Sequence, residues 1–107
     1  LRDFTHIDDI TISIEKLINK PSKKNIPFQV INIGGNKAVS LRKYLSVIES
    51  YVGKKAKIKY KPLQPGDVYK TQASNTKIFK LTNFLPKTPL EKGISEFIIW
   101  YKKYYKR

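Results

Sequence analysis

The chain has 107 residues, with 22 Lys and Arg against 8 Asp and Glu, a formal net charge of +14, and 40% apolar residues. A chain of this length forms one small domain, and the apolar share is that of a globular protein rather than of a disordered tail. The absence of Cys excludes disulfides and thiolate sites, and a single His leaves no basis for a histidine-built metal site, so we expect no bound metal.

The first third of the chain predicts a short entry strand, a helix and a strand. Residues 3–6 have the pattern of the entry strand. The helix follows from apolar residues at helical spacing, with two aspartates in the first turn and Pro21 beyond the end. The apolar positions of this helix are Ile7, Ile10, Ile14, Leu17 and Ile18. Residues 28–33 are apolar enough to predict a strand covered on both faces, and a turn through Gly34, Gly35 and Asn36 follows.

A second helix is predicted from Ser40, as N-cap, to Gly53, at the position of a C-terminal glycine. Residues 56–61 then alternate strictly, which predicts an edge strand with Ile58 and Tyr60 inward and lysines facing water. Residues 63–68 contain Pro-Gly-Asp and predict a turn.

The last third predicts two helices. Ser74 is the expected cap of a short helix that carries Ile78 and Leu81. Residues 88–91 combine a capping box with a proline at the first helical position, and open the last helix. Its expected buried stripe is Leu90, Ile94, Phe97, Ile98, Tyr101 and Tyr105.

These elements predict a small mixed α/β module with three to four helices and a few short strands. The strand at 28–33 has too few neighbours in this chain to cover both of its faces. We therefore expect structure from elsewhere to complete it, and we expect the isolated chain to self-associate or to be marginally stable.

Several polar groups have a simple structural explanation. Asp8 and Asp9 are adjacent on a helix and point in different directions, so they fit helix-start charges better than an acid/base pair. His6 has no Ser or Cys nucleophile placed around it, which favours a structural or wall-lining role. Gly34-Gly35 lacks the third spaced glycine of a dinucleotide fingerprint, so a tight turn explains both residues.

Most of the charge lies in residues 54–107, which carry 14 basic and 3 acidic groups. Nucleic-acid binding is one interpretation, and aromatic residues among the basic ones near Arg107 could stack on bases or meet a membrane surface. However, 19 of the 22 basic residues are Lys, whereas base and phosphate readers favour the Arg fork. A solvated lysine face therefore explains the charge better, and we expect neither a nucleic acid nor a membrane as partner.

One further constellation, Arg2 with Gln64, Gly66 and Asp67, suits an anion with an attached sugar. The planar Arg fork satisfies two phosphate oxygens at once, and an amide with a carboxylate suits ribose or sugar hydroxyls. By itself this is a plausible anion pocket.

The same residues carry a resemblance to a known family. The motifs are Arg2-Asp3-Phe4-Thr5-His6-Ile7-Asp8-Asp9, Ile31-Asn32-Ile33-Gly34, Gln64-Pro65-Gly66-Asp67-Val68 with Thr71 and Ala73, Thr88-Pro89-Leu90-Glu91-Lys92-Gly93 and Trp100-Tyr101. In this order they resemble the C-terminal third of an NAD-dependent nucleotide-sugar epimerase of the extended short-chain dehydrogenase/reductase family, and most of all the UDP-glucuronate 4-epimerases.

The resemblance implies a fold and a role for each matching residue. It implies that residues 1–107 are a single C-terminal substrate-binding segment of a larger Rossmann-type enzyme, which is cytoplasmic. Arg2 would bind the diphosphate of a UDP-linked sugar, and Gln64 and Asp67 would contact the nucleotide. Many relatives have Arg where this chain has Gln64, so a second cation on the phosphates is missing here.

The resemblance also implies what this chain lacks. The glycine-rich NAD turn and the catalytic Tyr-x-x-x-Lys pair lie in an N-terminal Rossmann portion, and neither pattern occurs in these residues. We therefore expect NAD in the parent enzyme, no cofactor on this segment, no catalytic residue within it, and no activity of the segment alone. The absence of Met at position 1 agrees with a piece of a longer protein. A nucleotide-sugar dehydratase or decarboxylase, and a free-standing basic nucleic-acid-binding module, are the alternatives.

Overall fold

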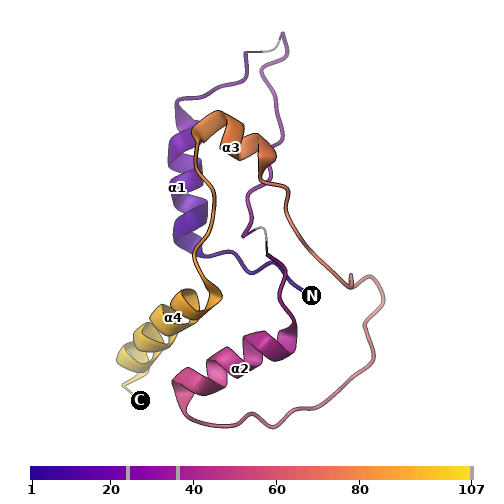
Figure 1. Ribbon diagram of the computed structural model, residues 1–107, viewed down its shortest axis with the longest axis vertical. Coiled ribbons are helices and arrows are strands. Elements are labelled where there is room, and N and C mark those ends of the chain that lie inside the picture. Colours follow the sequence, from indigo (N-terminus) through magenta and orange to yellow (C-terminus); the bar gives the residue numbers. More distant parts are fainter. Residues whose placement is uncertain (24, 36, 107) are drawn as a thin grey trace.

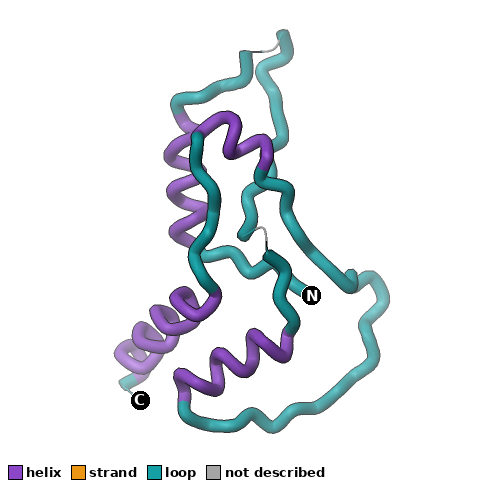
Figure 2. Tube along the Cα trace, in the orientation of Figure 1, coloured by secondary structure: helices purple, strands orange, loops and turns teal. Residues whose placement is uncertain are grey.

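The computed structural model describes residues 1–23, 25–35 and 37–106. The chain forms four helices joined by long extended segments (Figures 1 and 2). They are α1 (Ile7–Ile18), α2 (Leu41–Val52), α3 (Thr76–Thr82) and α4 (Leu90–Tyr105). Asn36 of the predicted turn and Arg107 of the predicted basic end lie outside the described residues. Within these ranges no helix is both long and apolar enough to cross a membrane.

The helices pack as two separate pairs, α2 with α4 and α1 with α3. The segment between α2 and α3 runs as a wide loop along one side of the molecule (Figure 1). The radius of gyration is 17.3 Å, against about 13 Å for a compact domain of this length. The chain is therefore less compact than a typical domain of its length and has no single core that joins the two helix pairs.

Helix α2 forms where the sequence predicts it. The Ser40 side chain accepts the Lys43 N–H at 3.1 Å, and Gly53 ends the helix at φ 74°, in the left-handed region that favours glycine. Both signals are local, and both predictions are confirmed.

Helix α1 also has the predicted bounds, but it presents a different face to its neighbour. His6 is the N-cap, and its ring Nδ1 accepts the Asp8 N–H at 3.4 Å. The residues buried on this helix are Asp9 and Ser13, whereas the isoleucines at positions 7, 14 and 18 are exposed. Three of the apolar positions of this helix therefore face away from the rest of the described chain.

Helix α3 begins at Thr76, with Asn75 rather than Ser74 at the N-cap and no side-chain cap bond. The Ser74 hydroxyl lies 3.4 Å from Thr76 Oγ1 instead. The Asn75 side-chain amide donates a hydrogen bond to the Gly34 carbonyl oxygen and accepts one from the Gly34 N–H. The side chain of Ile78, on this helix, is fully buried.

Helix α4 begins at Leu90, with Pro89 at the N-cap and no side-chain cap. The predicted capping box is wrong, because the Thr88 N–H donates to the Asp9 carboxylate at 2.9 Å and so fixes this segment against α1. The main apolar cluster lies between α2 and α4 and consists of Val47, Ile94 and Ile98, flanked by Tyr44, Ile48 and Leu90. The aromatic half of the predicted stripe, Phe97, Tyr101 and Tyr105, is exposed.

The predictions of strands at 3–6, 28–33 and 56–61 are wrong, because no regular strand occurs in the described part of the chain. One antiparallel bridge joins Arg2 to Val39 through two hydrogen bonds of 2.9 Å. A strand needs a neighbour for its backbone groups, and segments 28–33 and 56–61 run without one. Ile58 and Tyr60, predicted to face inward, are both exposed.

Candidate functional site

Arg2 and Asp67, two of the three predicted site residues, lie in contact. Asp67 forms an ion pair with Nη2 of Arg2, and both side chains are partly exposed. Nη1 of Arg2 donates to the carbonyl oxygens of Val68, at 2.5 Å, and Leu1, at 3.1 Å. The guanidinium plane is thus fixed by three acceptors on two segments of the chain.

Gln64 joins this site through the main chain. Its carbonyl oxygen accepts the Asp67 N–H at 3.1 Å, and Gly66 between them has φ 88°, which only glycine adopts at little cost. Asp67 Oδ1 also accepts the Val68 N–H at 2.9 Å. The turn predicted at 63–68 is confirmed, whereas the Gln64 side chain is exposed and no contact brings it to Arg2 within the described ranges.

A run of hydrogen bonds holds the N-terminal segment beside residues 69–73. The Leu1 nitrogen donates to Tyr69 O at 2.7 Å, and the Thr71 N–H donates to Leu1 O at 3.3 Å. The Asp3 N–H donates to Thr71 Oγ1 at 3.2 Å. These bonds place Arg2 next to a turn that lies 65 positions further along the sequence.

Gly34 is packed too tightly to form a phosphate cradle. A Cβ at this position would lie 2.4 Å from Ala73 Cβ, and one at Gly35 would lie 2.7 Å from Asp3 Oδ1. The glycines therefore serve a close approach of two segments. The tight turn predicted here includes Asn36, which lies outside the described residues.

Asn75 and Asp9 are structural residues of this region that sequence reasoning missed. The Asn75 amide donates to Gly34 O at 2.6 Å and accepts the Gly34 N–H at 3.2 Å, and both residues are buried. The Asp9 carboxylate, also buried, accepts the Thr88 N–H. No local pattern signals either contact, because each partner lies more than 40 positions away in the sequence.

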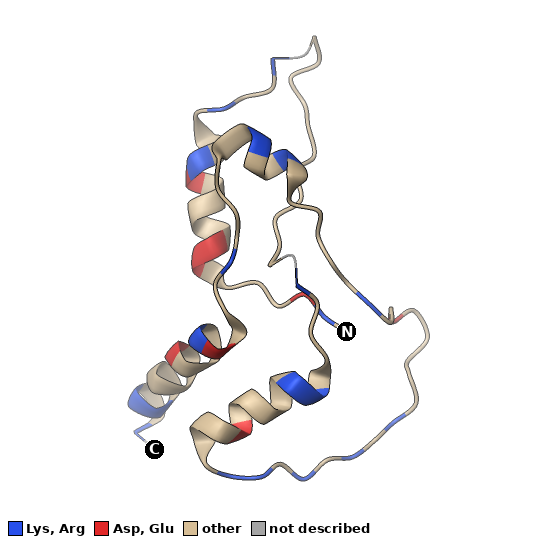
Figure 3. Cartoon of the chain, viewed as in Figure 1, with Lys and Arg blue, Asp and Glu red and all other residues tan. Residues whose placement is uncertain are grey.

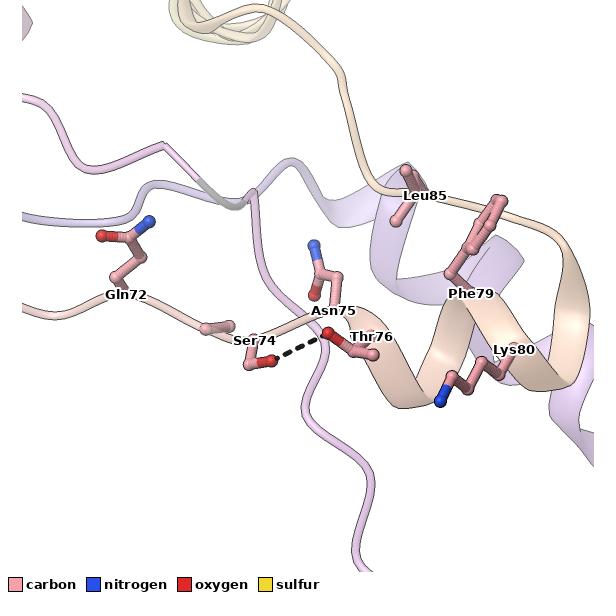
Figure 4. Close-up of a pocket in the computed structure, with 8 residues that line it drawn as sticks. Gln72, Ser74, Asn75, Thr76, Phe79, Lys80 and Leu85 are labelled. Atoms are coloured by element: carbon pink, nitrogen blue, oxygen red, sulfur yellow. Dashed lines mark hydrogen bonds between the residues drawn. The ribbon is translucent and has the colours of Figure 1, made fainter.

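Two hollows lie beside the segments 1–3 and 69–73 that position Arg2, rather than at the Arg2–Asp67 pair. A groove of about 560 Å³ follows the start of α3 (Figure 4). Its lining is Gln72, Ala73, Ser74, Asn75, Thr76, Phe79, Lys80 and Leu85. A second hollow of about 450 Å³ touches Asp3, Asn32, Gly34 and Thr71, and it borders the segment that positions Arg2. Neither is lined by Arg2, Gln64 or Asp67.

His6 lies between α1 and α4. Its Nε2 is 3.3 Å from a Glu96 carboxylate oxygen, and its Nδ1 caps α1 by accepting the Asp8 N–H. The ring lines a hollow of about 230 Å³ and packs on Gly93, where a Cβ would lie 2.9 Å from the ring. His6, Asp8 and Glu96 form a group with metal-ligand chemistry, but both ring nitrogens already face protein partners. The structural, wall-lining role of His6 explains this geometry.

Basic residues gather away from the Arg2–Asp67 pair. Figure 3 shows them along the loop that follows α2, where the sequence has Lys54, Lys55, Lys57, Lys59 and Lys61. Lys55 pairs with Glu49 at 2.9 Å, and Glu49 also accepts the Ala56 N–H at 2.9 Å. These two hydrogen bonds, the backbone one first, lower the pKa of Glu49. The start of this loop is thus anchored to α2 by its own chemistry.

Comparison with known proteins identifies relatives of the chain. No model of a known protein family matches it. It is 37% identical to protein CapI of Staphylococcus aureus over all of its own length and 36% of that protein. It is 36% identical to a probable UDP-glucuronate 4-epimerase of Rhizobium meliloti, over 99% of the chain and 36% of the relative.

Solved structures agree with these relatives. The UDP-glucuronic acid 4-epimerase of Bacillus cereus, in complex with UDP-glucuronic acid and NAD, superposes with a TM-score of 0.83 at 32% identity. The match covers 96% of this chain and 32% of the enzyme. The chain spans about a third of the length of the proteins it matches. The chain is therefore similar, over about a third of their length, to the C-terminal part of UDP-glucuronate 4-epimerases.

Proposed function

We propose that this chain is the C-terminal, nucleotide-sugar-binding segment of an NAD-dependent C4 epimerase, that UDP-glucuronate is its nucleotide sugar, and that the segment is inactive alone. The observation that carries the proposal is the Arg2 guanidinium, oriented by Asp67 and Val68 at the surface. It is supported by relatives whose names and bound molecules are those of UDP-glucuronate 4-epimerases.

Arg2 suits a diphosphate because part of its hydrogen-bonding fork is unused. The described residues engage its two Nη groups through three hydrogen bonds. The guanidinium carries five N–H donors, so the Nε–H and one Nη2–H stay available for two oxygens of a phosphate. Asp67 acts as the positioning residue, since its carboxylate holds the fork through one Nη2–H.

NAD, in the whole enzyme, supplies the acceptor and donor of the hydride at the sugar C4. The residues of this chain do not fit NAD, because Ala73 and the Asp3 carboxylate lie directly against Gly34 and Gly35 and leave no space for a phosphate. The contribution proposed for this segment is to hold the nucleotide through Arg2, Gln64 and Asp67 while the sugar turns.

Titration of the 107-residue chain with UDP tests the proposal. Arg2→Ala removes the charge-assisted hydrogen bonds to phosphate, each of which contributes about 1.5–3 kcal/mol, so we expect UDP affinity to fall at least about 10-fold. Arg2→Lys keeps one charge without the fork and should give an intermediate loss. The matched control is Arg42→Ala, because Arg42 is an exposed arginine on α2 that bonds the Tyr60 hydroxyl at 3.3 Å.

Two results would contradict the proposal. One is equal UDP affinity in the Arg2 and Arg42 variants. The other is no UDP binding together with tight, steeply salt-dependent binding of a nucleic-acid oligonucleotide, which would instead support a basic nucleic-acid-binding module.

A further inference from the structure

The Asp3 side chain joins the segment that carries Arg2 to two other segments of the chain. Its Oδ2 accepts the Ala73 N–H at 3.1 Å, and its main-chain N–H donates to Thr71 Oγ1 at 3.2 Å. Its Oδ1 is buried and lies against Gly35, where a Cβ would come within 2.7 Å of it. Three segments of the chain therefore meet at this one residue.

The main chain of Arg2 is held on both of its edges. Arg2 exchanges two hydrogen bonds of 2.9 Å with Val39 on one edge. On the other edge, its neighbour Leu1 donates to Tyr69 O at 2.7 Å and accepts the Thr71 N–H at 3.3 Å. These bonds fix the Arg2 backbone, whereas the direction of its long side chain depends on the groups that its guanidinium meets.

The acceptors of the guanidinium belong to the turn that comes directly before residues 69–73. Asp67 and the carbonyl oxygen of Val68 supply two of its three acceptors. Residues 69–73 form no helix or strand in the described chain, so their position depends on individual hydrogen bonds such as those to Asp3. A side chain that holds this segment therefore also fixes where Asp67 lies.

We propose, on the basis of the proposed function, that Asp3 is a second positioning residue for the arginine that binds the diphosphate. Its carboxylate holds Ala73 beside the N-terminal segment, and so keeps Asp67 where it orients the Arg2 fork. Loss of a negative charge does not by itself weaken the binding of an anion, because a carboxylate does not attract a phosphate. A lower UDP affinity after removal of the Asp3 carboxylate therefore reports lost geometry rather than lost attraction.

A double-mutant cycle in the 107-residue chain tests whether Asp3 acts through Arg2. Asp3→Ala removes the acceptor of the Ala73 N–H, and we expect UDP affinity to fall about threefold to tenfold. In the Arg2→Ala background the same change should have less than about a twofold effect, because no guanidinium remains to be positioned. Asp3→Asn keeps an acceptor oxygen and should lose less affinity than Asp3→Ala.

Thr5→Val is the matched control for the loss of a hydrogen bond in the same segment. The Thr5 hydroxyl accepts the Gly35 N–H at 2.9 Å, so it joins the N-terminal segment to Gly35 rather than to Ala73. We expect Thr5→Val to lower the stability of the chain as Asp3→Ala does, but to leave UDP affinity within about twofold of the wild type.

A second readout needs no nucleotide. Phenylglyoxal reacts with arginine guanidinium groups, and mass spectrometry gives the rate of modification at each arginine. The chain has three arginines, and Arg42 on α2 serves as the internal reference. We expect Asp3→Ala to raise the Arg2 rate at least about threefold relative to Arg42, and Thr5→Val to leave this ratio unchanged.

The outcomes separate the positioning role from the nucleotide site. Equal losses of affinity from Asp3→Ala in the wild-type and Arg2→Ala backgrounds would overturn the proposal, because they would show a general structural role. An Arg2 rate that Asp3→Ala and Thr5→Val raise equally, or that neither raises, would overturn it as well. If the wild type does not bind UDP but Asp3→Ala alone raises the Arg2 rate, the positioning role stands and the nucleotide-binding function fails. If Arg2→Ala weakens UDP binding and Asp3→Ala changes neither readout, the function stands and the positioning role fails.

Discussion

Arg2 reaches Asp67 across 65 positions of sequence because backbone hydrogen bonds lay residues 1–3 along residues 69–73. The ion pair therefore lies at the end of a series of hydrogen bonds between residues 1–3 and residues 69–73, and is not an isolated surface contact. An exposed ion pair alone contributes little to stability, so the value of Asp67 lies in orienting the guanidinium.

Glu91 gives a prediction about pH. A hydrogen bond from Lys43 lowers the pKa of Glu91 below its ordinary value of 4.5, and the Glu91 backbone N–H lowers it further. A carboxyl whose pKa is lowered by folding stabilises the fold above its unfolded pKa, and the stabilisation disappears as pH falls through the folded pKa. The Lys43–Glu91 pair joins the first turns of α2 and α4 at 2.9 Å.

Melting temperatures measured between about pH 6 and pH 3 in the wild type and Glu91→Gln check this sign. We expect the variant to be slightly less stable than the wild type above pH 4.5 and the difference to vanish at the acid end. Glu15→Gln on α1 is the control. A difference that grows as pH falls would contradict the assignment.

Single residues also show which contacts the sequence could reveal. Ser40 and Gly53 were predictable, since each acts on its own helix within a few residues. Asn75, which bonds Gly34, and Asp9, which bonds Thr88, were not predictable because their partners are far away in the sequence. Arg2 and Asp67 were found through family motifs. Their proximity depends on the hydrogen bonds between residues 1–3 and residues 69–73.

At the scale of elements, the helices were predictable and the strands were not. A helix satisfies its backbone within itself, so periodicity and local caps placed α1, α2 and α4 within one residue or so. A strand depends on a neighbour, and the pattern at 28–33 describes a segment whose neighbour is not among the described residues. The pattern at 56–61 fails for the same reason.

The α2–α4 pair provides an element-scale prediction. Ile98 is 8% exposed within the cluster that joins the two helices, and the adjacent Ile99 is 65% exposed. In the longer protein proposed above, we expect Ile98→Ala to lower the free energy of unfolding by about 2–4 kcal/mol, because it removes buried apolar contacts and leaves a cavity. Ile99→Ala should cost less than about 0.5 kcal/mol.

Chemical denaturation of the two alanine variants, followed by circular dichroism, measures this difference. Equal effects would show that the α2–α4 contact does not limit stability. Because both variants remove the same atoms from neighbouring positions, helix propensity cancels between them.

At the scale of the whole molecule, two helix pairs and a wide loop form a frame with little core. In the described part of the chain the buried apolar residues are Val47, Ile78, Ile94 and Ile98. Such a core offsets little of the entropy of ordering 107 residues. The uncovered apolar segment at 28–33 and the family motifs, which resemble only the C-terminal third of the relatives, predicted this incompleteness, and composition alone did not.

The isolated chain should therefore unfold with low cooperativity and associate without a fixed stoichiometry as its concentration rises. Its exposed aromatic residues on α4, among them Phe97, Trp100 and Tyr104, form an apolar surface that promotes association. Sedimentation velocity over the micromolar range, combined with thermal unfolding, tests this expectation. A compact monomer with a sharp transition would contradict it.

The central claim is that this chain holds the nucleotide within a longer NAD-dependent epimerase. The most direct test is to sequence the source gene for about two hundred codons upstream of Leu1, since this chain spans about a third of its relatives. We predict an open reading frame with a glycine-rich turn after a strand and, further on, a Tyr-x-x-x-Lys pair. A start codon immediately before Leu1, with neither motif upstream, would contradict the claim.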